Sequence, residues 1–437
     1  MAQAEIYAVC GDPILHSLSP EIFNAAFASA GLESAYTRVA AGSAEEALEL
    51  ARAIGVRGLN VTSPFKESMA ELMDETDEVA SAMGAVNTVR ITERGVHGYN
   101  TDATGVATLL ERGHVDPRGK HFVILGAGGA ARSAAYALKN LEAEVTVVNR
   151  TRSRGERMAE SLGVGFAPLE EAGKHLAKAF AAFACLPQGV GFEDEKALGR
   201  VKFIIDANYH GSPFADFARK HGIRYADGRE WLLGQARASF RIFTGMEPSA
   251  DAMRRAVELG AAKNRDTRFL VLTGMMGTGK SAVARALAEP LGMEAIDTDS
   301  MVEAEAGKPI PRIFEEDGEC QFRELEARAV DASFTKPRRV IALGGGALTN
   351  EDLARLVRSK GTVVWLWASP PTCADRAGDG TRPLLEGKDA GEEAARILSE
   401  RRMSYARASD MVISTEGHGP DETAGKIADE MRKSRRG

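Results

Sequence analysis

The stretch Gly274-Met-Met-Gly-Thr-Gly-Lys-Ser281 constrains the fold of this chain most, because it fits the phosphate-binding pattern G-x-x-x-x-G-K-[ST]. The apolar run 269–272 before it predicts a buried strand, and the apolar spacing of residues 282–287 after it predicts a helix. In this context backbone N–H groups surround nucleotide phosphates, the lysine reaches the β- and γ-phosphates, and the hydroxyl binds Mg²⁺. The expected nucleotide-binding residues are Gly274, Gly277, Thr278, Gly279, Lys280 and Ser281.

The 437 residues predict two to four domains at roughly 150 residues each. A net charge of −7 argues against a nucleic-acid partner. The four cysteines are too far apart to predict a disulfide framework or a zinc site. We also find no signal-peptide pattern and no apolar run near the roughly 18 residues of a membrane span. We therefore expect a cytoplasmic protein without a membrane segment, and the composition leaves its oligomeric state open.

In the first hundred residues, polar side chains follow short apolar segments. A strand is expected at residues 5–10, with a helix through Phe23 and Phe27 after it, and further strands end near residues 60, 87 and 100. Open α/β sheets bind ligands at the carboxyl ends of their strands. Individually, these residues could be helix caps or turn residues. The candidates are Ser17, Ser19, Asn60, Thr62, Lys66, Asn87, Asn100 and Asp102.

A βαβ unit is predicted from residue 121 onward. The apolar run 121–125 leads into a glycine turn and a helix over residues 133–138, and a second strand follows at 144–148. A glycine turn in this setting binds dinucleotide pyrophosphate at a helix N-terminus, and Ala131 is an allowed substitute for the third glycine. The expected cofactor-binding residues are Gly126, Ala127, Gly128, Gly129 and Ala130.

The end of the second strand predicts the cofactor type. An NAD site usually has an acidic residue there, but this chain has Asn149, Arg150, Thr151 and Arg154. Two arginines suit the 2′-phosphate of NADP. The alternative is an exposed basic turn without a ligand.

Together these motifs resemble those of shikimate dehydrogenases, from residue 5 to about residue 262. The resemblance implies reduction of 3-dehydroshikimate with NADPH, with Lys66 and Asp102 as the catalytic pair. Hydride arriving at a ketone carbon creates an oxyanion, and a lysine held by a carboxylate can supply the charge and the proton. The resemblance implies these shikimate-binding residues: Ser17, Ser19, Asn60, Thr62, Asn87, Tyr209 and Gln235. Segments 184–189 and 208–210 depart from the family pattern.

After the P-loop, Asp297 and Asp299 lie at the end of an expected strand. Alternate strand residues share a face, so we expect both carboxylates on one side, where they could hold Mg²⁺ and orient a hydroxyl nucleophile. Arg323, Glu326, the glycines at 344–346, Arg382 and Arg401 follow. Individually, the arginines could be solvated, the glycines could form a plain turn, and residues 375–390 could be a surface loop rather than a lid.

In this order, the motifs of residues 268–437 resemble those of shikimate kinases. The resemblance implies that Lys280 and Ser281 bind ATP and Mg²⁺, that Asp297 is an outer Mg²⁺ partner, and that Arg382 closes over the phosphates. Lys280, Asp299 and Arg382 would be the catalytic residues. It places shikimate against Asp299, Arg323, Gly344, Gly345, Gly346 and Arg401, where arginines suit a carboxylate.

The prediction is therefore an α/β protein with two enzymes in one chain, using NADP(H) and ATP with Mg²⁺ on 3-dehydroshikimate and shikimate. We expect a substrate domain at 1–102 with a returning helix at 236–262, a Rossmann NADP domain at 103–235, a linker at 263–267, and a P-loop kinase domain with a parallel sheet at 268–437. Two alternatives stay open: broader quinate and shikimate specificity, or a regulatory or binding protein of the same folds without activity.

Overall fold

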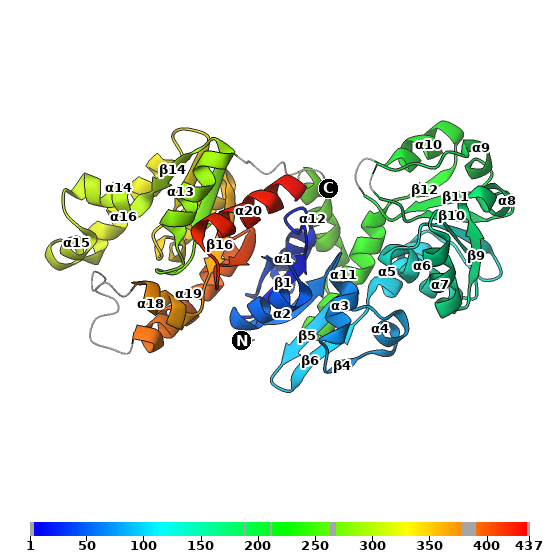
Figure 1. Ribbon diagram of the computed structural model, residues 1–437, viewed down its shortest axis with the longest axis horizontal. Coiled ribbons are helices and arrows are strands. Elements are labelled where there is room, and N and C mark those ends of the chain that lie inside the picture. Colours follow the sequence, from blue (N-terminus) through cyan, green and yellow to red (C-terminus); the bar gives the residue numbers. More distant parts are fainter. Residues whose placement is uncertain (1–3, 188, 210–211, 263–267, 378–389, 435–437) are drawn as a thin grey trace. The chain divides into compact units, whose positions relative to one another are not determined.

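The computed structural model describes residues 4–187, 189–209, 212–262, 268–377 and 390–434 (Figure 1). Close contacts divide the chain into two compact units. Unit 1 comprises Met1–Pro20, Gly31–Leu59 and Leu259–Gly437, and unit 2 comprises Glu21–Ala30 and Asn60–Glu258.

Unit 1 is built on a sheet whose strands have the order β14-β15-β13-β16-β17-β2-β1-β3, and the pairs from β14 to β1 are parallel. The strand before the P-loop, β13, is completely buried between β15 and β16, which explains its uninterrupted apolar sequence. The strands are β1 (Ile6–Gly11), β2 (Ala35–Ala40), β3 (Val56–Val61), β13 (Phe269–Thr273), β14 (Glu294–Asp297), β15 (Arg339–Ala342), β16 (Thr362–Trp367) and β17 (Met411–Ser414).

Helices connect parallel strands of unit 1, as parallel pairing requires, and a final helix follows the last strand, β17. They are α2 (Ala44–Ala53), α13 (Lys280–Leu291), α14 (Thr298–Ala306), α15 (Ile310–Glu316), α16 (Gly318–Ser333), α17 (Glu351–Lys360), α18 (Pro370–Ala377), α19 (Ala390–Ala408) and α20 (Pro420–Ser434).

Unit 2 contains a second, six-stranded parallel sheet of order β12-β11-β10-β7-β8-β9. Its strands are β7 (His121–Leu125), β8 (Glu144–Asn149), β9 (Gly165–Pro168), β10 (Ala181–Ala184), β11 (Phe203–Asp206) and β12 (Arg224–Ala226). The predicted βαβ unit is confirmed as β7, α6 (Gly129–Asn140) and β8. Short strands β4 (Glu75–Thr76), β5 (Thr88–Thr92) and β6 (Gly95–Tyr99) precede this sheet in the sequence.

The remaining helices belong to unit 2 in whole or in large part. They are α1 (Ser19–Ser29), α3 (Lys66–Glu71), α4 (Glu78–Met83), α5 (Asp102–Arg112), α7 (Arg152–Leu162), α8 (Ala172–Leu176), α9 (Glu195–Leu198), α10 (Pro213–His221), α11 (Gly228–Thr244) and α12 (Ala250–Ala262).

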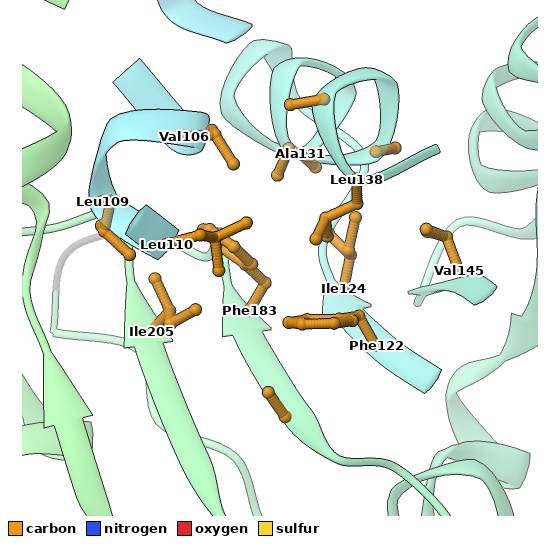
Figure 2. Close-up of a cluster of buried hydrophobic side chains, with 14 of the residues drawn as sticks. Val106, Leu109, Leu110, Phe122, Ile124, Ala131, Leu138, Val145, Phe183 and Ile205 are labelled. Atoms are coloured by element: carbon orange, nitrogen blue, oxygen red, sulfur yellow. The ribbon is translucent and has the colours of Figure 1, made fainter. Parts of the chain in front are cut away.

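An apolar cluster fills one side of the six-stranded sheet (Figure 2). Phe122, Phe183 and Ile205 from its strands pack with Leu109 of α5 and Leu138 of α6. All five are 2% exposed or less, so this core fixes α5 and α6 against the sheet.

Two glycines let α5 and α11 approach closely. A Cβ added at Gly105 would lie 2.4 Å from a ring carbon of Trp231, and one added at Gly234 would lie 2.9 Å from the Cα of Gly105. This close crossing places the polar face of α11, which includes Gln235, beside the start of α5 at Asp102.

No helix in the described part of the chain is long and apolar enough to span a bilayer.

Candidate active sites

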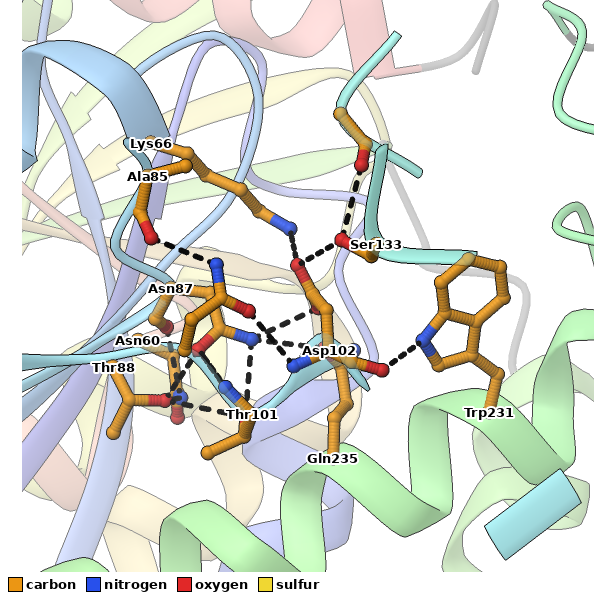
Figure 3. Close-up of polar contacts among 12 residues, drawn as sticks. Asn60, Lys66, Ala85, Asn87, Thr88, Thr101, Asp102, Ser133, Trp231 and Gln235 are labelled. Carbon is orange, nitrogen blue, oxygen red and sulfur yellow. Dashed lines mark hydrogen bonds and ion pairs between the residues drawn. The ribbon is translucent and has the colours of Figure 1, made fainter. Parts of the chain in front are cut away.

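Lys66 and Asp102 form an ion pair in unit 2 (Figure 3). Lys66 is the first residue of α3 and Asp102 the first residue of α5. Their Nζ and Oδ2 atoms are 2.5 Å apart, and the side chains are 25% and 5% exposed, respectively. The lysine is thus accessible while its carboxylate partner is buried, which suits a cation that must meet a substrate.

Three groups hold Asp102 from other elements. The amide of Asn87 donates to its Oδ1 over 2.9 Å, and the hydroxyl of Ser133 on α6 lies 3.5 Å from its Oδ2. The indole N–H of Trp231 donates to its backbone carbonyl over 3.0 Å. Because α5, α6 and α11 all contribute, the position of the carboxylate depends on the packing of three helices.

Asn87 is the centre of a buried polar network. Its Oδ1 accepts the backbone N–H of Thr101 at 2.8 Å, and its amide nitrogen also lies 3.2 Å from Oε1 of Gln235. Asn60 donates to the carbonyl of Asn87 at 3.2 Å and to the hydroxyl of Ser239 at 3.0 Å. These contacts order the predicted site residues relative to one another, because buried polar groups with several partners have few alternative rotamers.

Some members of this network were not predicted from the sequence. The hydroxyl of Thr88 accepts from the amide of Asn60, and the hydroxyl of Thr101 accepts from the amide of Asn87. Both threonines are next to predicted site residues in the sequence, and this position could have identified them. Ser133, Trp231 and Ser239 had no comparable local signal, because only the fold brings them near Asp102 and Asn60.

Ser17 and Ser19 lie in unit 1, where the Ser17 hydroxyl donates to the Ser19 hydroxyl over 3.2 Å and accepts the Ser19 backbone N–H over 3.3 Å. In unit 2, Thr62 is half-buried just after β3. Tyr209 is also half-buried and follows Asn208, whose amide donates to the Leu186 carbonyl over 3.0 Å.

Asp206 anchors the segment before Tyr209. It is fully buried at the end of β11 and accepts the backbone N–H of Asn208 over 2.9 Å as well as the hydroxyl of Ser212. Burial raises the pKa of this carboxyl, and its hydrogen bonds with Ser212 and Asn208 oppose the rise.

The glycine turn after β7 fits a pyrophosphate. Gly126 has φ +114°, and a Cβ added there would lie 2.4 Å from the Cys185 carbonyl, so a larger residue is excluded. At Gly128 and Gly129 an added Cβ would meet nothing within 4 Å, so the start of α6 is open toward a ligand. Ala131 is fully buried in the core, and Ala127 and Ala130 are partly buried against it.

The basic turn after β8 presents two arginines to solvent. Arg150 and Arg154 are exposed, and among the described residues neither side chain makes a hydrogen bond or ion pair. Arg152, between them, is instead paired with Glu156 at 2.8 Å. The Asn149 amide donates to the Thr151 carbonyl over 2.9 Å and closes the turn.

The P-loop adopts a conformation that needs its glycines. Gly274 and Gly277 have φ of +139° and +80°, and a Cβ on either would lie 2.3 Å from a backbone oxygen. Lys280 Nζ donates to the carbonyls of Gly274 and Met275 over 2.9 Å, and the Thr278 hydroxyl donates to Met275 over 2.8 Å. These bonds hold the loop around the lysine in an arrangement that fits nucleotide phosphates. Gly279 caps α13 and Ser281 is half-buried in its first turn.

The prediction that Asp297 and Asp299 lie on one face of a strand is wrong. Strand β14 ends at Asp297, and Asp299 lies in the first turn of α14, so strand alternation does not relate the two. Asp297 caps the helix instead, and its Oδ1 accepts the backbone N–H groups of Asp299 at 3.0 Å and Ser300 at 3.4 Å. The chain begins α14 here instead of extending β14, because the Asp297 carboxylate accepts free N–H groups at the start of the helix.

Predicted substrate residues of the kinase part converge on the glycine turn at 344–346. A Cβ added at Gly344 would lie 2.6 Å from Asp299 Oδ1, and one at Gly346 would lie 2.9 Å from Arg323 Nη1. Arg401 donates to the Gly345 carbonyl over 3.1 Å. The turn therefore brings one carboxylate and two guanidinium groups together.

Glu326, which the sequence motifs did not assign to the site, orients Arg323. Its Oε2 accepts from Arg323 Nη1 at 2.8 Å, and its side chain is 3% exposed. Burial raises the pKa of Glu326, and the hydrogen bond with Arg323 opposes that rise. Its spacing of three residues from Arg323, one turn of α16, was the signal that could have identified it. Arg382 lies outside the described residues.

Four family models match the chain. Shikimate dehydrogenase substrate binding domain matches residues 9–89, Shikimate / quinate 5-dehydrogenase matches 108–188, and Shikimate 5'-dehydrogenase C-terminal domain matches 228–258. Shikimate kinase matches residues 276–432.

The shikimate dehydrogenase (NADP(+)) of Methanothrix thermoacetophila is 38% identical over 261 residues, which cover 58% of this chain and 96% of that protein. The chain belongs to the shikimate dehydrogenase family. Since a shikimate kinase model matches the part of the chain beyond this dehydrogenase, the chain is a bifunctional enzyme of the shikimate pathway.

Solved structures of a shikimate dehydrogenase and of a quinate dehydrogenase agree with this membership. The Thermus thermophilus enzyme in complex with NADP(H) and shikimate is 32% identical, with a TM-score of 0.54 over 59% of this chain and 99% of that one. The quinate dehydrogenase of Corynebacterium glutamicum in complex with NAD is 27% identical, with a TM-score of 0.55 over 59% and 99%.

Proposed function

We propose that the dehydrogenase site reduces 3-dehydroshikimate to shikimate with NADPH, and that the kinase site converts this shikimate to shikimate 3-phosphate with ATP. The observation that supports the first step most directly is the ion pair of accessible Lys66 with buried Asp102. NADPH supplies the hydride when bound. Lys66 donates a hydrogen bond and then a proton to the ketone oxygen, while Asp102 keeps the ammonium group in position.

The substrate is held by hydroxyl and amide groups in this proposal. Ser17, Ser19, Thr62 and Tyr209 would bind hydroxyl or carboxylate groups of shikimate, with Asn87 and Gln235. Asn60 is assigned to the same site. Its hydrogen bonds to the Asn87 carbonyl and the Ser239 hydroxyl would also help to orient Asn87.

NADP would lie on the turn formed by Gly126, Ala127, Gly128, Gly129 and Ala130. Exposed Arg150 and Arg154, with Asn149 and Thr151, would bind its 2′-phosphate. A guanidinium group without another partner is well suited to a phosphate, because both of its N–H pairs are available.

In the kinase site, we assign the nucleotide to the P-loop residues Gly274, Gly277, Thr278, Gly279 and Lys280. Ser281 would bind Mg²⁺ directly, with Asp297 as an outer partner, and Mg²⁺ would neutralise phosphate charge. Among the described residues, no group of three or more His, Cys, Asp or Glu side chains could hold a metal ion.

Shikimate would be bound in the kinase site by Asp299, Arg323 and Arg401 at the turn of Gly344, Gly345 and Gly346. Arg323 and Arg401 suit its carboxylate, and Asp299 suits the hydroxyl that attacks ATP. Arg382 is assigned to the closing of the site over the phosphates.

We further propose the domain boundaries expected from the sequence, namely 1–102 with the returning segment 236–262, 103–235, a linker at 263–267, and 268–437. The returning segment was expected to be one helix, but it contains the end of α11 and all of α12. A cytoplasmic location and small-molecule partners without nucleic acid are part of the same proposal.

A test assays one purified chain and its Lys66→Ala and Lys280→Ala variants for shikimate oxidation with NADP⁺ and for phosphorylation with ATP·Mg²⁺. Each variant should lose one activity and keep the other. The C. glutamicum relative acts as a quinate dehydrogenase with NAD in its complex, so quinate with NAD⁺ is the competing pair. Faster turnover with that pair would favour the broader specificity, and binding of shikimate without turnover would favour a regulatory protein.

A further inference from the structure

The loop between β1 and α1, residues 12–18, is held by the C-terminal helix of the kinase part. The backbone N–H groups of Ile14 and Leu15 both donate to Oε1 of Glu430, at 2.7 and 2.6 Å. Glu430 lies on α20 and is 6% exposed. Hydrogen bonds to a buried carboxylate are stronger than those between neutral groups, so these two constrain the loop.

A buried arginine fixes the far end of this loop. Arg38 on β2 is 1% exposed, and its Nε and Nη2 donate to the Ser17 carbonyl at 3.1 and 2.6 Å. Its Nη1 donates to the carbonyl of Asp410 at 3.0 Å, just before β17 of the kinase part. One guanidinium group therefore connects the backbone of Ser17 to the backbone of the kinase part.

Pairing of strands accompanies these contacts. Strands β2 and β17 run parallel, with Val39 opposite Val412 and Ala40 opposite Ile413. Lys433 of α20 also pairs with Asp12 at the start of the loop, at 2.8 Å. The latter pair is exposed and contributes little to stability, so the buried Glu430 and Arg38 are the contacts that matter most.

We propose that Glu430 is a positioning residue for the dehydrogenase reaction: the kinase part of the chain sets the position of Ser17 and Ser19 through the loop that Glu430 holds. The inference rests on the proposed binding of shikimate by these two serines. In this proposal Glu430 does not contact the substrate. It acts through its hydrogen bonds to the backbone N–H groups of Ile14 and Leu15.

The consequence is that the dehydrogenase site depends on an intact kinase part of the same chain. A displacement of about 1 Å in a substrate-positioning group can cost on the order of 10²-fold in rate. Loss of the Glu430 carboxylate would leave the N–H groups of Ile14 and Leu15 without this acceptor, and the loop would take other positions. Shikimate binding would then weaken, whereas the kinase residues at the P-loop and at the turn 344–346 would keep their contacts.

The experiment compares Glu430→Ala, Glu430→Gln and the control Asp429→Ala in the full chain. Asp429 is the preceding residue on α20, but it is exposed and pairs with Arg432 on its own helix. For each variant we would measure KM for shikimate and for NADP⁺, kinase kcat/KM, and hydrogen exchange of the peptide that contains residues 12–19.

We expect Glu430→Ala to raise the dehydrogenase KM for shikimate about tenfold or more, equivalent to one hydrogen bond to a charged group. KM for NADP⁺ and kinase kcat/KM should change less than about twofold, and exchange of peptide 12–19 should rise. Glu430→Gln keeps an acceptor oxygen, so it should restore most of the shikimate KM. Asp429→Ala should behave as the wild type.

Two results would overturn the proposal: an unchanged shikimate KM in Glu430→Ala, or an equal loss of both activities in Glu430→Ala and Glu430→Gln, which would indicate general destabilisation. Failure of the proposed function is a separate outcome, because the wild-type chain itself would then lack shikimate oxidation.

Discussion

Replacing Lys66 by alanine should remove the dehydrogenase activity while the kinase activity of the same chain stays intact. Lys66 Nζ lies 2.5 Å from Asp102 Oδ2 and is the accessible member of the pair. A positioned general acid contributes about 10²- to 10⁴-fold to a rate. That loss corresponds to roughly 2.7 to 5.4 kcal/mol in the activation free energy, at about 1.36 kcal/mol for each factor of ten.

The same change should also lower the free energy of unfolding. Asp102 is only 5% exposed and loses its cation, although it still accepts the Asn87 amide at 2.9 Å. Because a buried carboxylate is left without its cation, we expect a cost of about 3 kcal/mol, at the low end for broken buried ion pairs.

The assay follows NADPH formation from shikimate and NADP⁺ by absorbance, and kinase turnover in the same sample shows that the chain is folded. Lys66→Arg is the matched control, since it keeps the charge but a guanidinium group does not give up a proton. It should resemble Lys66→Ala in kcat. A loss of less than about threefold in Lys66→Ala, or near wild-type kcat in Lys66→Arg, would refute the proton-donor role.

Three further predictions follow from the site geometry. Removing Arg150 and Arg154 together should raise KM for NADPH about 10- to 100-fold and leave KM for NADH unchanged. Arg152→Ala is the control and should change neither KM, because Arg152 is already paired with Glu156. Equal effects of the double variant on both cofactors would contradict this prediction. Lys280→Ala should lower kinase kcat by at least about 10²-fold with normal shikimate oxidation, and a parallel loss of oxidation would argue against separate sites. Burial raises the pKa of Asp206 in the folded state above 3.8. The wild type should therefore lose stability as pH rises from the pKa of the unfolded state through that of the folded state. Asp206→Asn has no carboxyl group at this position and should not show this loss. The unfolding midpoint of Asp206→Asn relative to wild type should therefore rise over that window, and a constant difference at every pH would contradict the argument.

Features defined by a few adjacent residues could be predicted from the sequence. The P-loop and the βαβ unit each combine a strand, a glycine turn and a helix within about 30 residues, and both were confirmed. Glycines are informative here, because Gly126 and Gly274 adopt positive φ beside a backbone oxygen that excludes a Cβ.

Features that depend on distant residues could not be predicted. The contacts of Trp231 with Asp102 and of Ser239 with Asn60 need the close crossing of α5 and α11 and the return of α11. The contact of Glu430 with Ile14 joins residues 416 positions apart, for which no local pattern exists. Asp299 was misplaced on a strand because a capping aspartate and a strand-end aspartate look alike in the sequence.

We propose that one chain performs two consecutive reactions at two separate sites. The most direct measurement supplies the purified full chain with 3-dehydroshikimate, NADPH and ATP·Mg²⁺ and follows the products by mass spectrometry. We predict shikimate first and then shikimate 3-phosphate, with one NADPH and one ATP consumed for each product molecule. Accumulation of shikimate without phosphorylation, or no consumption of NADPH, would contradict the proposed function.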